Sequence, residues 1–378
     1  MHTPDLDTLR TRRTRKWTAY PDDVLPAWIA ESDFSTCPAV KEAIAQRVAA
    51  ESFGYTPATS EVPEALADFS EHRYGWRPDP ESIVEVPDVV RGLTLAVQFF
   101  TRPDSPVVVP TPAYPPFLSI PDAAGRERVD VDARGGLDLD EIERAFAQGA
   151  GSILLCSPHN PLGYTFDEEF LHDLVALAQR HGARVLVDEI HAPLVLDGDH
   201  VAAAGLSDEA AQTCVTVTAT SKAWNIAGLK CAQMILSNPD DLRVWRGLNP
   251  VVKDGVGTLG VFAAAACYRH GEEFLDRQVA CLRDHRDWLV EELPRRIPGL
   301  RIARPKATYL MWLDFRETAL GATDDPAGHL LRHGRVALND GRHFGPGGEG
   351  HARLNFATSR ENLEDIVHRL ALGSQHHG

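Results

Sequence analysis

Three features are missing from this 378-residue sequence, and each absence excludes a class of protein. No stretch approaches the ~18 uninterrupted apolar residues of a membrane-spanning helix, so we expect no membrane partner. There is no excess of basic residues: the formal net charge is −16, which argues against a nucleic-acid partner. The N-terminal residues 1–17 include a basic stretch but have no apolar run behind it, so we expect no secretory signal.

Paired cysteines are also absent. The six cysteines are scattered without the spacing of a disulfide framework or a zinc site, and the 16 histidines form no H-E-x-x-H or similar spacing. This cysteine usage is typical of proteins in the reducing cytoplasm. We therefore expect a cytoplasmic protein that has no disulfide bonds and binds no metal.

What is present is a regular alternation of β-rich and helical patterns in the centre of the chain. Apolar runs without polar alternation indicate strands buried on both faces, as in a mostly parallel sheet covered by helices. Between the first two runs, apolar residues recur at helical spacing over 167–182, and Gly182 stands where a C-terminal cap is expected. The runs that predict strands are 151–158, 183–190, 213–220 and 231–237.

From about residue 271 the pattern changes to a long amphipathic helix followed by short strands, which is typical of an α+β domain. The Pro-rich N-terminal residues are expected to fold back onto that domain, and the terminal His-His-Gly is expected to be a disordered tail. We therefore predict an α/β protein with two domains. The predicted divisions are 1–45 for an N-terminal arm and part of the small domain, 46–270 for the large domain and 271–378 for the C-terminal small domain.

Polar side chains follow three of the predicted strands. Asn160 stands in SPHNPLG, Asp188 and His191 stand in VDEIHA, and Lys222 stands in TATSK. Because ligands bind at the carboxyl ends of the strands in an open α/β sheet, we expect these groups to converge on one edge. Each residue alone has an ordinary structural explanation, such as a helix cap, a turn or a solvated lysine. Their coincidence at successive strand ends favours a functional site.

The chemistry that needs this set is pyridoxal-phosphate catalysis. A lysine forms a Schiff base with the cofactor aldehyde, and a carboxylate pairs with the pyridinium nitrogen so that the ring acts as an electron sink. Further donors tune the phenolic oxygen of the ring. The sequence has six lysines against 32 arginines, yet two of the six, Lys222 and Lys230, lie within one short segment. We predict that Lys222 binds the cofactor covalently and that Lys230 meets its phosphate.

The motifs SPHNPLG, DEIHAPLV and TSKAWNIAGLK, in this order, resemble those of the fold type I aminotransferases. The stretches LPAWIAESDF, FGYTPAT, AYPPF, DEIHA and VALNDGRHFG, with ARLNFA, are similar to those of the MalY/PatB group of cystathionine β-lyases. The resemblance covers about residues 12–370. It implies the fold of a fold type I PLP-dependent transferase, in which both termini contribute to the smaller α+β domain. It also implies a homodimer whose active sites are shared between the subunits.

The resemblance assigns roles around pyridoxal 5'-phosphate. Lys222 would bind the cofactor and move the Cα proton, Asp188 would pair with the pyridine nitrogen, and Tyr114 would stack on the ring. Asn160 and His191 would face the phenolic oxygen. The phosphate would be met by Val89, Val90, Ser221 and Lys230, and Tyr55 of the neighbouring subunit would reach the phosphate or the substrate.

The resemblance also implies how a small amino-acid substrate is bound. Arg353 would hold the substrate α-carboxylate as a bidentate fork. Asn339 and the backbone of Ala30 would lie beside it. Two of the implied residues keep an ordinary alternative: Tyr114 as core packing and Arg353 as a surface strand residue.

Three positions depart from the usual pattern of the group. Glu31 begins ESDF where the group has Asp-Met-Asp-Phe, Asp88 replaces a glycine before the phosphate amides, and Pro193 follows DEIHA where the group commonly has Asp. A carboxylate beside a phosphate dianion is repulsive, unless Asp88 turns away or pairs with Arg91. These changes leave the identity of the substrate open.

The implied function is a carbon–sulfur β-lyase that acts on L-cystathionine or related cysteine S-conjugates and releases a thiol, pyruvate and ammonia. An aminotransferase of an L-amino acid, or an enzyme of another β-elimination or replacement on the same carbanion, uses the same residues for the first half of its reaction, so the sequence does not separate them. A non-catalytic regulator is a third hypothesis, which the intact set of Lys222, Asp188 and Asn160 disfavours.

One further motif, GVGTLG at 255–260, fits the dinucleotide pattern G-x-G-x-x-G. It follows no predicted strand and leads into an Ala-rich helix. That context favours a helix used in subunit packing over a dinucleotide site.

Overall fold

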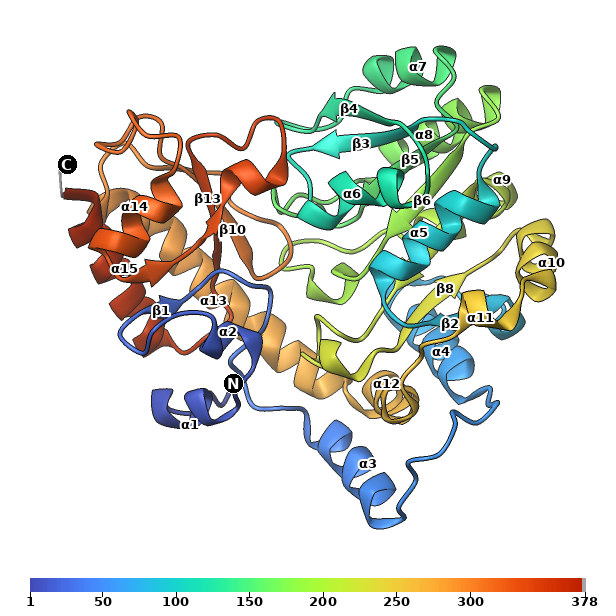
Figure 1. The fold of residues 1–378 in the computed structure, drawn as a ribbon, viewed down its shortest axis with the longest axis horizontal. Helices are drawn as coiled ribbons and strands as arrows, with labels where there is room; N and C mark the ends of the chain where they lie inside the picture. The colour runs from blue at the N-terminus through green and yellow to red at the C-terminus, as the bar shows by residue number, and fades with distance from the viewer. Residues whose placement is uncertain (376–378) are drawn as a thin grey trace.

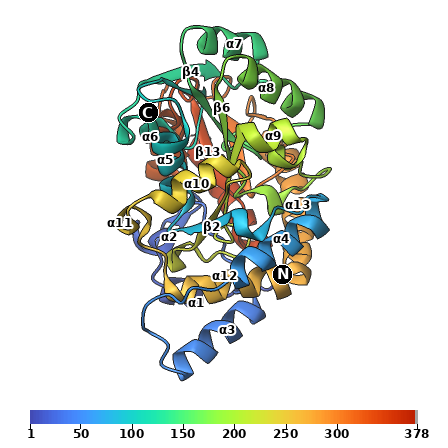
Figure 2. The same ribbon diagram turned by 90° about the vertical axis from the view of Figure 1, so that its right-hand side faces the viewer.

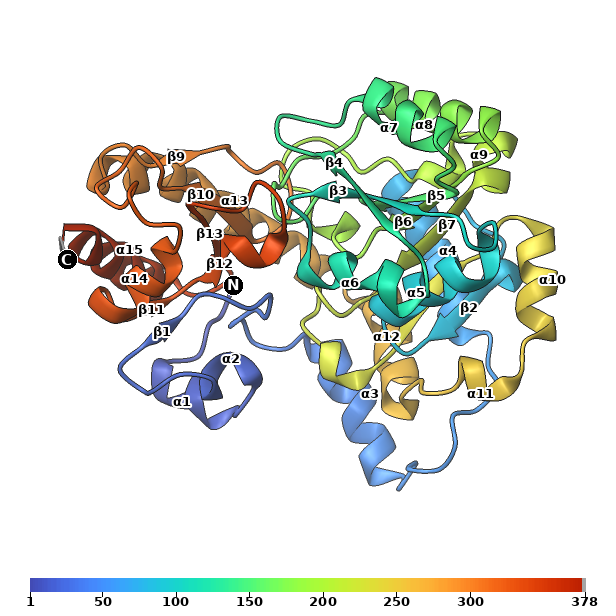
Figure 3. The ribbon, with the colours of Figure 1, turned by 45° about the horizontal axis from the view of Figure 1, so that its top comes forward.

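The computed structural model describes residues 1–375 and has two lobes, each built on its own sheet (Figures 1 and 3). The expected tail, 376–378, lies outside the described residues. The larger lobe has a seven-stranded sheet in the order β2-β8-β7-β6-β5-β3-β4. Strands β3 to β7 pair in parallel, and β8 pairs antiparallel with both β2 and β7. The strands are β2 (Ile83–Val86), β3 (Val107–Thr111), β4 (Arg128–Asp132), β5 (Ser152–Cys156), β6 (Arg184–Asp188), β7 (Cys214–Thr218) and β8 (Ala232–Ile235).

Helices cover both faces of this sheet, as the uninterrupted apolar runs predict. Buried side chains of α5, α6 and α10 pack on one face, and those of α7, α8 and α9 pack on the other. Figure 2 shows α5 and α8 on opposite sides of the sheet. The predicted α/β class with a mostly parallel sheet is confirmed. These helices are α5 (Val89–Phe100), α6 (Pro115–Ala123), α7 (Leu139–Ala147), α8 (Glu168–Arg180), α9 (Asp208–Thr213) and α10 (Pro239–Gly247).

Helix α8 illustrates how local sequence sets an element. The Asp167 carboxylate accepts the backbone N–H of Phe170 and caps the first turn. Apolar residues at helical spacing are buried along one side, and Gly182 follows the helix with a φ of +57°, which suits glycine. The helix predicted over 167–182 therefore forms with both of its end signals.

The smaller lobe has a four-stranded antiparallel sheet in the order β12-β13-β10-β9. The N-terminal chain joins this lobe, because β1 (Leu25–Pro26) pairs in parallel with β11 (Val336–Ala337). The long helix α13 (Glu272–Arg296) runs between the lobes (Figure 1). The other elements of this lobe are α1 (Leu6–Thr11), α2 (Arg15–Thr18), β9 (Arg301–Ile302), β10 (Leu310–Asp314), α14 (Pro326–His333), β12 (Asn339–Asp340), β13 (His351–Asn355) and α15 (Arg360–Gln375).

Helices α3 (Pro38–Ala49) and α4 (Glu61–Tyr74) pack against α12 (Thr258–His270) of the large lobe. Helix α3 is continuous across residue 45, so the division predicted there falls inside a helix. We propose that the large domain begins at α3.

Helix α12 is the Ala-rich helix that follows GVGTLG. Its alanines 263–266 are buried under α3 and α4 within the chain, where the sequence had suggested subunit packing. The glycines before it follow the short helix α11 (Pro250–Lys253) and not a strand. The structural context that a dinucleotide motif requires is therefore missing here.

Within residues 1–375, no helix is long and apolar enough to cross a membrane. All six cysteines are free thiols. The same range contains no cluster of three or more histidine, cysteine or acidic side chains arranged to hold a metal ion.

Candidate active site

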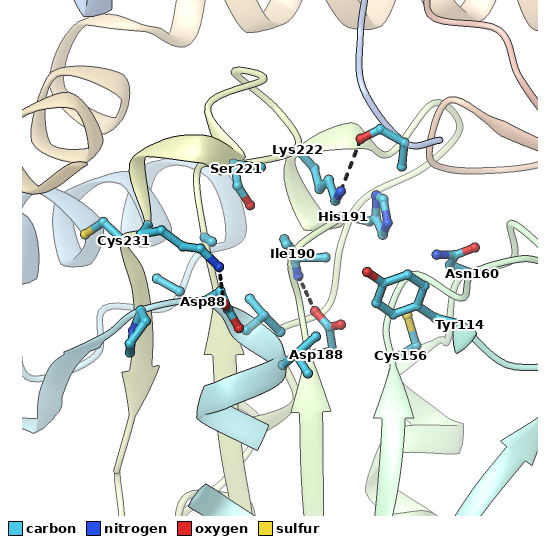
Figure 4. A pocket seen from close by; sticks show the side chains of 18 residues that line it. Asp88, Tyr114, Cys156, Asn160, Asp188, Ile190, His191, Ser221, Lys222 and Cys231 are labelled. Carbon is cyan, nitrogen blue, oxygen red and sulfur yellow. Dashed lines mark hydrogen bonds and ion pairs between the residues drawn. The ribbon is translucent and has the colours of Figure 1, made fainter. Parts of the chain in front are cut away.

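The carboxyl ends of β5, β6 and β7 meet at one edge of the large sheet, and the loops after them line a cavity of about 300 Å³ (Figure 4). The arrangement predicted from the strand ends is therefore present. The cavity is lined by these sequence-predicted residues: Ala30, Val89, Val90, Tyr114, Asn160, Asp188, His191, Ser221, Lys222 and Lys230.

Lys222 places its amine inside this cavity. Its Nζ donates a hydrogen bond to the backbone carbonyl of Ala30 at 3.1 Å. Burial and, second, the charge of Arg353 lower the pKa of the Lys222 amine to about 8, although the carboxylates of Glu31 and Asp188 act in the opposite direction. A lysine with this pKa carries a substantial free-base fraction at mildly alkaline pH, which is the form that attacks an aldehyde or accepts a proton.

Asp188 ends β6 and is buried at the base of the cavity. One carboxyl oxygen accepts the backbone N–H of Ile190 at 2.9 Å. Burial raises the pKa of Asp188 to about 7, although the Ile190 N–H and the Lys222 charge act in the opposite direction. A carboxyl group held this far from water gains a strong partner when a cationic ring nitrogen is placed beside it.

Arg353 approaches the cavity from β13 and is 2% exposed. Its guanidinium donates to Asn160 Oδ1 at 2.9 Å and to the Trp28 carbonyl at 3.2 Å, and it lies over the Phe344 ring with its Cζ 4.9 Å from the ring centroid. Figure 4 shows the amide nitrogen of Asn160 on the side of His191 and Tyr114. Arg353 therefore fixes Asn160 with its amide donor toward the cavity.

Two buried polar atoms beside the cavity have no hydrogen-bond partner among the residues that the structure describes: His191 Nδ1 and Arg353 Nε. Burial, together with the charges of Lys222 and Arg353, lowers the pKa of His191 to about 3, so its imidazole is neutral. Burial also lowers the pKa of Arg353 to about 10, which leaves the guanidinium charged at neutral pH. Because buried polar atoms are nearly always paired in native proteins, this set fits a polar ligand with an anionic group near Arg353.

The helix α5 points its N-terminus at the cavity, and Val89 and Val90 form its first turn. First-turn N–H groups have no partner within a helix and attract anions. Ser221 and Lys230 also line the cavity, and Lys230 Nζ lies 2.7 Å from the carboxylate of Asp88, the N-cap residue of this helix. Tyr114, which precedes α6, lies beside Asn160, and burial raises the pKa of its phenol. Donors suited to a phosphate thus line one end of the cavity and an aromatic ring lines another part.

Asp88 neither turns away from this cavity nor pairs with the Arg91 side chain, the two alternatives that the sequence left open. One carboxyl oxygen accepts the backbone N–H of Arg91 at 2.8 Å and caps α5, and the other pairs with Lys230 Nζ at 2.7 Å. The Arg91 guanidinium instead donates to the Val252 carbonyl at 3.1 Å. The pairing of Lys230 with Asp88 was not predicted.

Three of the sequence-predicted residues do not line the cavity: Arg353, which meets it through its hydrogen bond to Asn160, and Tyr55 and Asn339. Tyr55 is fully exposed in the segment before α4, and its expected role in a neighbouring subunit stays a prediction. Asn339 lies in β12 directly opposite Arg353 of β13, so it adjoins the arginine through the backbone pairing.

The residues that hold the Ala30 segment over Lys222 were not predicted from the sequence. Tyr309, which is fully buried, donates its hydroxyl to the Ala30 carbonyl at 3.0 Å. Asn355 donates to the Ile29 and Glu31 carbonyls at 2.6 and 2.7 Å. Asn355 could have been predicted, because it lies within ARLNFA, one of the motifs that carry the family resemblance. Tyr309 lies in none of these motifs.

Glu31 and Pro193, the other two positions that differ from the usual pattern of the group, lie in ordinary structural surroundings. The ESDF segment that begins with Glu31 is anchored by Asp33, which forms a buried ion pair with Lys16 at 2.8 Å and accepts a hydrogen bond from Trp17 Nε1. Pro193 lies in the short 3₁₀ helix Ala192–Leu194, where its fixed φ is compatible with the turn.

A model of the family described as aminotransferase class I and II matches residues 29–370. The chain belongs to the aminotransferase class I and II family. A member of the family from Corynebacterium glutamicum, named cystathionine beta-lyase, is 52% identical over 371 residues, which cover 98% of this chain and 99% of that protein. The cystathionine beta-lyase PatB of Bacillus subtilis is 35% identical, with 92% of each chain covered.

Among solved structures, a crystal structure from Corynebacterium diphtheriae, described as a candidate PLP-dependent beta-cystathionase, matches with a TM-score of 0.98. It is 54% identical and the match covers 100% of both chains. The family and the fold that the sequence motifs imply are thereby confirmed.

Proposed function

We propose that this chain is a pyridoxal 5'-phosphate-dependent carbon–sulfur β-lyase. Its substrate would be L-cystathionine or a related cysteine S-conjugate, and its products a thiol, pyruvate and ammonia. The observation that carries the proposal is the placement in one cavity of the Lys222 amine, with its lowered pKa, and the buried Asp188 carboxyl group, beside the partly unpartnered guanidinium of Arg353. The relative of 52% identity, named cystathionine beta-lyase, supports the substrate class.

The residues of the cavity fit the cofactor. Lys222 would hold it covalently, Asp188 would pair with its ring nitrogen, and Asn160 and His191 would face its phenolic oxygen. The first turn of α5, with Ser221 and Lys230, would hold the phosphate, and Tyr114 would lie against the ring. When bound, pyridoxal phosphate supplies an electron sink for the electron pair that remains on Cα after its proton is removed.

The protein supplies binding and proton transfer. Arg353 would bind the substrate α-carboxylate through its free Nε–H, which is buried. The free-base amine of Lys222 would accept the Cα proton, and the Ala30 carbonyl, itself fixed by Tyr309, would orient that amine. Cleavage of the Cβ–S bond expels the thiol, and water converts the remaining three-carbon unit to pyruvate and ammonia.

The assembly that we propose is a homodimer in which Tyr55 reaches the site of the partner. Support comes from two large apolar side chains that stand exposed on one loop: Tyr55 is 103% exposed and Phe53 is 65% exposed. Exposed apolar groups gathered in this way are typical of interaction surfaces. Thr56 and Thr258, whose hydroxyls are 2.9 Å apart, hold this segment beside α12.

For location we propose the cytoplasm. The support is that none of the six cysteines is in a disulfide.

The second candidate function is an aminotransferase acting on an L-amino acid. The family match favours it as an alternative, since the family model is that of aminotransferases. The same residues would bind the cofactor and remove the Cα proton. An aminotransferase requires a keto acid acceptor for repeated turnover, whereas a β-lyase does not, so the keto acid requirement separates the two.

The cofactor part of the proposal is tested by the Lys222→Ala variant. The wild-type protein should develop an absorption band from covalently attached cofactor, and borohydride should fix the cofactor to the peptide that contains Lys222. The variant should show neither. A variant that still attaches cofactor covalently would contradict the assignment.

A further inference from the structure

Asp88 is the N-cap residue of α5. At this end, a phosphate-binding helix usually offers hydrogen-bond donors and no anionic side chain. The Asp88 carboxylate caps α5 at Arg91, within the same first turn as Val89 and Val90. Its second oxygen forms an ion pair with Lys230 at 2.7 Å. Asp88 and Lys230 both line the cavity, and a dashed line in Figure 4 marks the ion pair that Asp88 forms there.

The charge of Asp88 is negative at neutral pH. Burial raises the pKa of this carboxyl group, but Lys230 and the N–H groups of Arg91 and Val90 outweigh it and hold the pKa below its usual value. Two groups that would serve a phosphate, Lys230 and the Val90 amide, therefore already interact with an anion that belongs to the chain. The side-chain charges of Lys230 and Asp88 cancel.

The ion pair is nevertheless easy to break. The Lys230 side chain is 56% exposed and that of Asp88 is 39% exposed. Ion pairs with this much solvent access contribute little to stability, because water and salt screen them. Lys230 can therefore leave Asp88 when a stronger anion enters.

We propose that Asp88 is a built-in competitor of the cofactor phosphate: it holds Lys230 and the first turn of α5 when the phosphate is absent, and it weakens phosphate binding when the cofactor is present. This inference rests on the proposed cofactor. The consequence is a lyase whose cofactor is retained mainly through Lys222 and the ring contacts and less through the phosphate.

A plain structural role for Asp88 predicts something different. Asp167 caps α8 with the same geometry, since it also accepts the N–H three residues ahead at 2.8 Å, and it does not line this cavity. If Asp88 were only a helix cap, replacing it with another capping residue would leave phosphate affinity unchanged. Asparagine caps a helix about as well as aspartate and carries no charge.

The test is an equilibrium titration of cofactor-stripped protein with pyridoxal phosphate, followed by absorbance and by tryptophan fluorescence. The Asp88→Asn variant should bind pyridoxal phosphate more tightly than the wild type, by about tenfold, since removing one charge–charge repulsion of this range is worth about one decade in Kd. Its affinity for pyridoxal, which lacks the phosphate, should not change. Inorganic phosphate should also compete better with the cofactor in the variant.

The matched control is Asp167→Asn, which should leave both affinities at wild-type values. Asp88→Ser, which keeps a capping hydroxyl, should repeat the effect of Asp88→Asn and guards against a variant that folds poorly. Equal Kd values for pyridoxal phosphate in wild type and both Asp88 variants would overturn the inference. If the wild type binds no pyridoxal phosphate, the proposed function fails instead, so the two failures are distinct.

Discussion

At the scale of single residues, the site depends on groups whose ordinary pKa values have been moved by burial. Burial lowers the pKa of Lys222 to about 8 and raises the pKa of Asp188 to about 7, so the two values lie close together. An amine and a carboxyl group of nearly equal pKa can both change protonation state close to neutral pH. Two pH-dependent measurements follow from this.

The first concerns the attachment of the cofactor to Lys222. Since only the free-base amine attacks an aldehyde, the attachment rate should rise with pH and reach half of its maximum near pH 8, the pKa of Lys222, instead of near 10.5. Stopped-flow absorbance of cofactor-stripped protein mixed with pyridoxal phosphate measures this. In Arg353→Met the midpoint should move upward, because the charge of Arg353 is the second cause of the lowered pKa. A wild-type midpoint above pH 10 would contradict the account.

The second concerns stability without cofactor. The pKa of Asp188 rises from 3.8 to about 7 on folding, so the folded protein binds more protons than the unfolded chain between these values. Stability therefore falls as pH rises through that window, and the loss is complete above pH 7. Asp188→Asn should be more stable than the wild type at pH 8, by roughly 3 kcal/mol, and the gain should shrink toward pH 4. Urea unfolding at pH 5 and pH 8 measures this, and a variant less stable at pH 8 would be the contrary result.

At the scale of elements, the segment 29–32 is held over Lys222 by contacts from three distant parts of the chain. Asn355 at the end of β13 donates to two of its carbonyls, Tyr309 donates to Ala30, and Asn225 exchanges two hydrogen bonds with the backbone of Ser32, each 2.9 Å long. The geometry around the Lys222 amine is therefore set by the junction of the lobes.

Replacing Asn355 with alanine should disturb this junction. Two carbonyls would lose their donor, which lowers stability by about 1–3 kcal/mol, and the loosened Ala30 carbonyl should reduce kcat. Asn362→Ala is a matched control, because Asn362 is also buried and hydrogen-bonded to Thr358 but lies on α15. The control should lose stability and keep kcat. If Asn355→Ala keeps the wild-type kcat, the segment does not position the amine.

The elements also show what sequence reasoning can reach. Asn160, Asp188 and Lys222 could be placed together because each follows a strand, and the ends of parallel strands meet at one edge. The partners of these groups could not be placed. Lys230 and Asp88 are 142 positions apart, and Ala30 and Tyr309 are 279 positions apart. Such pairs depend on how segments far apart in the chain pack together within a lobe, which local patterns do not encode.

At the scale of the whole molecule, the two-lobe architecture was predictable because strand and helix periodicity differ so clearly along the chain. The start of the large domain that we propose, at α3, could not be read from the sequence, because the packing of α3 on α12 joins segments far apart in the chain. Tyr55 marks another limit: its proposed role lies in a second copy of the chain.

Mixing two inactive variants tests this shared site. Lys222→Ala and Tyr55→Ala, unfolded together and refolded, should form hybrid dimers that hold one intact site each, so activity should recover to about a quarter of the wild-type value for random pairing. The matched control mixes Lys222→Ala with Asp188→Ala. Both residues serve the active site of their own chain, so neither site of a hybrid dimer is intact and no activity should return. No recovery in the first mixture would place Tyr55 outside the partner's site.

The central claim is carbon–sulfur β-elimination, and the most direct measurement is pyruvate release from L-cystathionine by the cofactor-loaded protein with no keto acid added. The account predicts many turnovers per site, with thiol and pyruvate formed in equal amounts. If pyruvate is absent and the bound cofactor is converted to its amine form until a keto acid is supplied, the protein is an aminotransferase and the account is wrong.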